Sequence, residues 1–206
     1  MTDEIRQRAA DRLELLPTRR PPGRVLVGFD GFIDTIADVV ARRRSAEPGD
    51  YEPVRTIADF GARIAASAGR STNIELRRRE ARGGGNGPLL AGALAALGVE
   101  VTLVGALGTA DDPASIDPAF GEIAATCEKT ISIAPAARTD ALEFDDGKVM
   151  FNWPASLDSI NADTLAAAVP QLPGLCARAD VIATINWTNT AGLGSIWRWL
   201  REHAMP

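Results

Sequence analysis

The chain has 206 residues, 46% of them hydrophobic, and is therefore long enough to bury a core of its own. Its formal net charge of -5 at pH 7 argues against general affinity for nucleic acid or for an anionic membrane surface. The two cysteines lie far apart, and the single histidine, His203, lies near the end of the sequence. We therefore expect no disulfide framework, no histidine metal cluster and no Ser-His-Asp triad.

The N-terminal segment MTDEIRQRAADRLELL is charged throughout and lacks the apolar region of a signal peptide. No apolar run in the sequence approaches the roughly 20 residues that a membrane-spanning helix needs. The arginine runs at 42–44 and 77–79 contain no aromatic residues and are typical of solvated faces. We expect a cytoplasmic protein that has neither nucleic acid nor a membrane as its partner.

In chain order, the first predicted element is an amphipathic helix over residues 3–16. Its apolar stripe comprises Ile5, Ala9, Leu13 and Leu16. A short connector leads to a strand at 24–29, the apolar run RVLVGF, which ends at a polar turn. Residues 42–55 are rich in Arg, Pro, Gly and Asp and predict a loop. A helix at 56–66 and a strand at 72–79 precede the glycine-rich stretch.

The elements after the glycines alternate between helix and strand. They are a helix at 88–97, a strand at 99–108, a helix at 117–127, a strand at 129–134, a helix at 161–169, a strand at 181–186 and a helix at 194–203. This alternation predicts an α/β fold with a mostly parallel sheet.

One segment departs from that alternation. TDALEFDDGKVMFNW, residues 139–153, predicts a β-hairpin whose two alternating strands meet at Asp146-Gly147. With the strand at 72–79, the hairpin predicts a small antiparallel flap beside the main sheet.

The stretch GGGNGPLLAGALAALG, residues 83–98, indicates a close approach of backbone to a ligand. A P-loop is excluded, because the Gly-Lys pair at 147–148 lies in the hairpin and is not followed by Ser or Thr. A dinucleotide fingerprint fails as well, because its third glycine would fall on Pro88 or Leu90. A flexible turn that caps a helix remains as the alternative without a ligand.

Six small residues in and after this stretch keep a fixed spacing: Gly84, Gly85, Gly87, Ala91, Gly98 and Gly108. The spacing resembles the first signature of the ribokinase-like sugar kinases, the PfkB family. That resemblance extends over nearly the whole chain after residue 24. It implies a mostly parallel sheet flanked by helices, with a small antiparallel β lid. Leu89 stands where the family has asparagine, and Asn86 is the candidate for part of its polar role.

The resemblance also implies the residues that bind the substrate. VLVGFDGFIDTI, residues 25–36, looks like the family's first strand and the aspartate that accepts two sugar hydroxyls. Asp34 matches that aspartate best and Asp30 is the second candidate, although either residue type is also common in solvated turns. The expected substrate-binding residues are Asp34, Asp30, Gly84, Gly85, Asn86 and Asn186. The two glycines and the following helix N-terminus would offer free backbone N–H groups.

Further expectations follow from the same resemblance. The lid segments would lie within 42–82 and 129–152, and the lid would join two chains as a homodimer. The substrate would be a sugar or a nucleoside-like molecule, and ATP and Mg²⁺ would be the cofactors. The hairpin is equally compatible with an ordinary surface hairpin.

The family's second signature, a G-A-G-D with the catalytic aspartate, has no match in this sequence. We therefore expect residues 1–206 to form a single, incomplete domain that lacks the C-terminal part of the fold, the catalytic base and the nucleotide site. Without the base and the phosphate site, the chain would neither position the reacting groups nor stabilise the charge that develops during phosphoryl transfer. We expect the chain to bind a substrate but to transfer no phosphate. The alternative is a non-catalytic sugar-binding or dimerising module.

Overall fold

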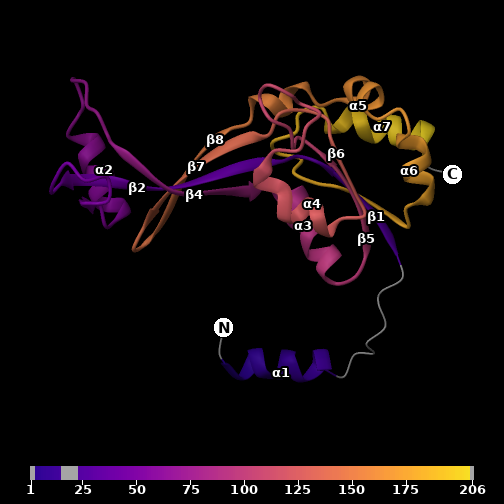
Figure 1. The fold of residues 1–206 in the computed structure, drawn as a ribbon, viewed down its shortest axis with the longest axis horizontal. Coiled ribbons are helices and arrows are strands. Elements are labelled where there is room, and N and C mark those ends of the chain that lie inside the picture. Colours follow the sequence, from indigo (N-terminus) through magenta and orange to yellow (C-terminus); the bar gives the residue numbers. More distant parts are fainter. Residues whose placement is uncertain (1–2, 15–22, 205–206) are drawn as a thin grey trace.

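The structure is a computed structural model that describes residues 3–14 and 23–204, and it contains two β-sheets (Figure 1). The first sheet has four parallel strands in the order β6-β5-β1-β9. Their bounds are β1 (Arg24–Phe29), β5 (Glu100–Gly105), β6 (Lys129–Ser132) and β9 (Val181–Thr184). The predicted parallel sheet is therefore confirmed.

Helices cover both faces of the parallel sheet (Figure 1). One face carries α5 (Ala162–Ala168), α6 (Leu172–Arg178) and α7 (Leu193–His203), and the other carries α3 (Asn86–Ala96) and α4 (Gly121–Thr126). The neighbours Leu26 and Val27 of β1 enter opposite cores, because successive side chains of a strand point to opposite faces. A continuous apolar run such as RVLVGF thus suits a strand that is covered on both sides.

The second sheet, which we call the lid, extends away from the first (Figure 1). Its strands are β2 (Phe32–Arg43), β3 (Tyr51–Pro53), β4 (Leu76–Gly84), β7 (Ala137–Phe144) and β8 (Gly147–Trp153). β2 lies between β4 and β7, and helix α2 (Ile57–Ala65) packs at the far end of the lid. A small core there joins the helix to the sheet through Ala37, Val39, Val54, Phe60 and Leu142.

The lid differs from the prediction in composition and direction. β2 pairs with β7 in parallel, so the lid is mixed rather than wholly antiparallel. The predicted loop at 42–55 in fact contains the end of β2 and all of β3. The strand predicted at 72–79 is shifted to 76–84 and includes Gly83 and Gly84. β2 does not alternate between polar and apolar residues, since neighbours such as Val39 and Val40 are both buried.

The remaining predicted elements are present with adjusted ends. β7 and β8 form the expected antiparallel hairpin around residues 145–146. Helix α1 (Asp3–Glu14) fits the helix predicted at 3–16, but its predicted apolar Ile5 is 53% exposed. Leu16 and the side chains of Ala9 and Leu13 lie outside what the structure describes.

Two short helical elements were not predicted, α6 and the 3-10 turn η2 (Ala155–Ser159), and a 3-10 turn, η1 (Pro118–Phe120), precedes α4. η1 and α4 together occupy the helix predicted at 117–127. Both Cys127 and Cys176 are free thiols. In the described part of the chain, the helices are all too short or too polar to cross a bilayer.

Candidate functional site

The candidate site lies where the parallel strands β1 and β9 end. The chain leaves β1 toward β5 on one side and returns later as β9 on the other side. Such a change of direction leaves a crevice at the carboxyl ends of the strands, which is where open α/β sheets bind ligands. Asp30 directly follows β1 and Asn186 follows β9, so the fold brings these two predicted residues together.

Asp30 is fully buried and accepts three hydrogen bonds. The donors are the backbone N–H groups of Asn86 at 2.9 Å and Gly87 at 2.7 Å, and the Asn186 side-chain amide at 2.6 Å. The carboxylate therefore caps the N-terminus of α3. The prediction that this helix end offers free donors is wrong for Asn86 and Gly87, because Asp30 takes both.

Two opposing effects act on the Asp30 carboxyl group. Burial raises its pKa above the ordinary value of 3.8, and this effect outweighs the hydrogen bonds from Asn186, Gly87 and Asn86, which lower the pKa. A Cβ atom at position 87 would lie 2.6 Å from Asp30 Oδ1. Glycine at position 87 is thus required by the close approach of the carboxylate.

Asn186 adopts a left-handed backbone conformation with φ of 61°. Its side chain donates to Asp30, and its Oδ1 accepts hydrogen bonds from Asn189 Nδ2 at 3.0 Å and Thr188 Oγ1 at 3.4 Å. Asn tolerates this conformation better than most residues do, and backbone strain of this kind concentrates at functional sites. Asn189 and Thr188 were not among the expected site residues, although the polar run NWTNT after a strand was the available signal.

Asp34 occupies a different position from Asp30. It lies on β2 opposite Arg82, two residue pairs beyond the pairing of Phe32 with Gly84. A Cβ atom at position 84 would come within 2.8 Å of Asp34 Cγ. The carboxylate therefore occupies the space beside Gly84 where another residue would have its side chain. Asp34 is only half-buried, in contrast to Asp30. The structure thus brings Asp34 and Gly84 together on one face of the lid.

The start of α3 arranges the other predicted residues. Gly85 has φ of 94°, a left-handed value that favours glycine, and its carbonyl accepts from Leu89 N at 3.2 Å. Asn86 and Leu89 are both exposed and lie three residues apart on one helical face. Asn86 therefore lies beside the position where the sugar-kinase pattern has its asparagine.

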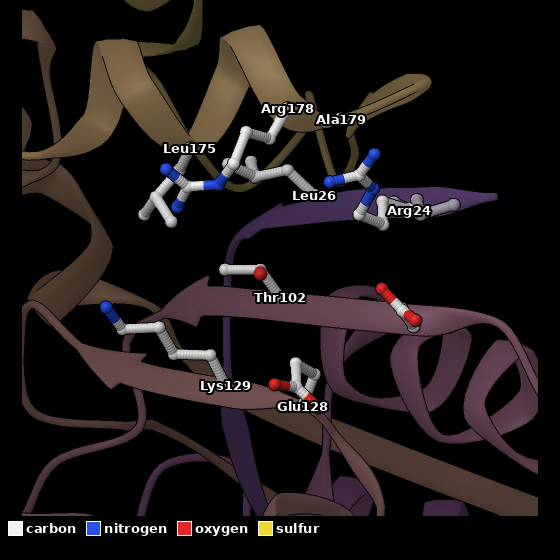
Figure 2. A pocket seen from close by; sticks show the side chains of 10 residues that line it. Arg24, Leu26, Thr102, Glu128, Lys129, Leu175, Arg178 and Ala179 are labelled. Atoms are coloured by element: carbon white, nitrogen blue, oxygen red, sulfur yellow. The ribbon is translucent and has the colours of Figure 1, made fainter.

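A hollow lies at the opposite, amino-terminal ends of the strands (Figure 2). Its volume is about 290 Å³, and Arg178 from α6 and Arg24 from β1 reach over Thr102. Lys129 and Glu128 lie below, so charges of both signs line it. Within residues 3–14 and 23–204, the structure contains no cluster of three or more His, Cys, Asp or Glu side chains that could hold a metal ion.

The fold is shared with solved carbohydrate kinases. A carbohydrate kinase from Agrobacterium tumefaciens superposes with a TM-score of 0.55 at 16% identity, over 90% of this chain and 52% of that one. The parallel sheet and the lid thus have the same fold as this carbohydrate kinase.

The sequence comparison is more specific. The family described as prokaryotic ketohexokinase matches residues 1–206. A ketohexokinase from Haloferax volcanii is 32% identical over 209 residues, which cover 99% of this chain and 54% of that protein. The chain belongs to the prokaryotic ketohexokinase family, and it spans about half the length of this curated relative.

Proposed function

We propose that this chain carries the substrate-binding part of a kinase that phosphorylates a ketohexose with ATP. The observation that supports the proposal most directly is the closeness of the Asp34 carboxylate on β2 to Gly84 at the end of β4, next to the start of α3. A half-buried carboxylate above a glycine leaves room for a sugar and can accept hydrogen bonds from two of its hydroxyls.

Asp34 suits this role better than Asp30. The oxygens of Asp30 already accept three hydrogen bonds from protein donors, and its side chain is fully buried. Asp30 and Asn186 therefore act by holding the N-terminus of α3 and the end of β9 in place. Gly84, Gly85 and Asn86 complete the wall that would face the sugar.

ATP and Mg²⁺ are the cofactors that kinase relatives imply, and two observations favour a nucleotide site outside the described residues. The N-terminus of α3, a favourable place for phosphate in many folds, already binds the Asp30 carboxylate. The described residues also form no acidic cluster for a metal ion. We propose that the nucleotide site and the catalytic base belong to the part of the longer relatives that this chain does not match, so that residues 1–206 form one incomplete domain.

The net charge and the exposed side chains of the domain also bear on its location and its partners. We propose a cytoplasmic protein that binds neither nucleic acid nor membranes, in line with its net charge of -5. Exposed apolar side chains on β8, among them Phe151 and Trp153, favour a homodimer through the lid. The same exposed surface favours the second candidate function, a non-catalytic module that binds sugar or dimerises.

Calorimetric titration of the purified chain with D-fructose tests the proposal. We expect saturable binding that Asp34→Ala weakens at least about tenfold, the usual effect of losing a hydrogen bond to a charged group. Lys129→Ala, in the hollow at the opposite ends of the strands, is the control and should bind as the wild type does. We expect no fructose-dependent ATP hydrolysis by the chain alone.

Two results would contradict this account. Turnover that Asp34→Ala abolishes would show that the chain contains its own catalytic base. Absence of fructose binding would remove the substrate-binding role and leave only the dimerising alternative.

A further inference from the structure

The hollow at the amino-terminal ends of the parallel strands is built on one face of the sheet. Thr102 of β5 is paired in register with Leu26 of β1 on one side and with Lys129 of β6 on the other. Residues paired in register share one face of a sheet, so these three side chains form one row. The pair of Arg24 with Glu100 lies two residues nearer the strand starts and therefore on the same face.

Helix α6 covers this face and supplies the upper wall of the hollow. Leu175 of the helix is buried in the same core as Leu26. Arg178 follows Leu175 by three residues and so lies on the same side of the helix, from which it reaches over Thr102 (Figure 2). The hollow thus has apolar walls from Leu26, Leu175 and Ala179, with charged side chains around them.

Three cationic side chains line the hollow without a carboxylate partner among the described residues. In residues 3–14 and 23–204, the ion pairs include none of Arg24, Lys129 and Arg178. Arg24 does not pair even though Glu100 lies opposite it in register. Arg79 on the lid, by contrast, pairs with two carboxylates. The three charges of the hollow are therefore available to a ligand.

The start of β1 is held on both sides, which gives the Arg24 side chain a defined origin. Asp180 Oδ2 accepts a hydrogen bond from Arg24 N at 2.7 Å, and Arg24 O accepts one from Asp180 N at 2.8 Å. On the other side, Glu100 N donates to Gly23 O at 3.2 Å. A backbone that is already fixed reduces the loss of freedom on binding.

Two carboxylates in the same hollow can accept hydrogen bonds from hydroxyl groups. Glu128 lies below Thr102 in Figure 2, and Glu100 lines the hollow as well. Ionised carboxylates accept hydrogen bonds and donate none. The volume of about 290 Å³ is near the lower end for small-molecule pockets, about 300–1,000 Å³. The lining therefore suits a small ligand with an anionic group, hydroxyls and a carbon skeleton.

We infer that this hollow binds a small hydroxylated phosphate monoester. Arg24, Lys129 and Arg178 hold the phosphate group, and the two carboxylates accept hydrogen bonds from the hydroxyls. A phosphate monoester carries a charge of about −1.5 to −2 at pH 7 and three acceptor oxygens, so it can bind several cationic side chains at once.

The inferred site is separate from the candidate sugar site. Six residues of extended chain lead from Arg24 at the start of β1 to Asp30 beyond its end, a distance of about 20 Å. The two sites thus lie at opposite ends of the same strand. The inference goes beyond the proposed function and does not depend on it.

Calorimetric titration of the purified chain with glycerol phosphate, inorganic phosphate and glycerol tests the inference. We expect saturable binding of glycerol phosphate, binding of inorganic phosphate that is at least about tenfold weaker, and no binding of glycerol. Arg178→Gln and Lys129→Ala should each raise the Kd for glycerol phosphate at least about tenfold, because each removes a charge-assisted hydrogen bond. Arg198→Gln, at an exposed arginine of α7 outside the hollow, is the matched control and should leave this Kd unchanged.

Glu128→Ala tests the role of the carboxylates. Loss of a negative charge should strengthen the binding of both anions alike, whereas loss of a hydroxyl acceptor should weaken the binding of glycerol phosphate alone. The preference for glycerol phosphate over inorganic phosphate should therefore fall about fivefold. An unchanged preference would overturn the role of Glu128 as an acceptor.

Other outcomes would overturn the site itself. Absence of saturable binding of either anion would do so, and so would an equal loss of affinity in Arg198→Gln. Inorganic phosphate that binds as tightly as glycerol phosphate would overturn the assignment of a hydroxylated ligand. Displacement of glycerol phosphate by excess D-fructose would place it in the candidate sugar site instead. Matching thermal unfolding midpoints of wild type and variants would support the assignment of the affinity losses to lost contacts.

Discussion

Asp30 shows how one buried side chain can hold a site together without being its ligand contact. Its carboxylate joins the end of β1, the start of α3 and the end of β9 through donors on Asn86, Gly87 and Asn186. These partners lie in two segments, at residues 86–87 and at residue 186, that are both distant from Asp30 in the sequence. We therefore expect Asp30 to act as a positioning residue, whose loss lowers stability first.

We expect Asp30→Asn to lower the free energy of unfolding by about 1–3 kcal/mol at pH 7, because the new amide would turn an N–H toward an existing donor. The pH dependence adds a second test. Because burial raises the pKa of Asp30, the folded state holds the proton more tightly than the unfolded state does. The wild type should thus lose stability as pH rises above about 3.8, and the variant should lack this contribution.

Urea unfolding at about pH 4.5 and pH 7.5 measures both effects. The stability advantage of the wild type over Asp30→Asn should narrow as the pH rises. An advantage that widens with pH would mean that the hydrogen bonds outweigh burial and lower the pKa. Asp111→Asn, on an exposed loop, is the control and should change little at either pH.

At the scale of elements, the junction from β4 to α3 decides where the lid meets the core. β4 ends at Gly84, α3 begins at Asn86, and Gly85 turns the chain between them with its left-handed φ. A side chain at position 84 would meet the Asp34 side chain rather than backbone. The fold can therefore survive a substitution there, while the Asp34 carboxylate must move.

Gly84→Ala should consequently separate binding from stability. We expect fructose affinity to fall at least about tenfold, and the free energy of unfolding to fall by about 1–3 kcal/mol, as overpacking does elsewhere. Calorimetry and urea unfolding measure the two quantities. The control is Gly61→Ala in α2, where an added Cβ meets no atom within 4 Å. Unchanged fructose binding by Gly84→Ala would contradict the placement of the sugar beside Asp34.

At the scale of the whole molecule, two exposed apolar surfaces compete as contact sites. Phe151 on β8 of the lid and Trp197 on α7 are each 46% exposed. Trp197 lines a largely apolar groove of about 860 Å³, together with Ile182 of β9 and Leu200 of α7. Large exposed apolar surfaces usually mark contacts with another molecule or domain.

We expect the chain to form a dimer through the lid and not through the groove. Phe151→Lys should raise the dimer dissociation constant at least about tenfold, because it places an unpaired charge in an apolar contact. Trp197→Lys is the control of equal exposure and should leave the dimer intact. Analytical ultracentrifugation measures both. Loss of the dimer in Trp197→Lys alone would place the contact in the groove instead.

The sequence predicted the regular parts of this molecule because their signals are local. The apolar run of β1, the helix after the glycines and the Asp146-Gly147 hairpin each depend on neighbouring residues, and all three are present. Strand β2 was not predicted, because it has no local alternation of polar and apolar residues: neighbours such as Val39 and Val40 are both buried. It is a strand because it pairs with β4 and β7, which are distant in the sequence.

The spacing of the small residues from Gly84 to Gly108 indicated a sugar-kinase family from the sequence alone, and the family model that matches residues 1–206 confirms it. Only the tertiary structure distinguished the two aspartates, which lie four positions apart on one segment of the sequence. It buries Asp30 against the N-terminus of α3 and places Asp34 over Gly84 on the lid. The physical reason is that each environment is built by residues distant in sequence, from α3 and β9 for Asp30 and from β4 for Asp34.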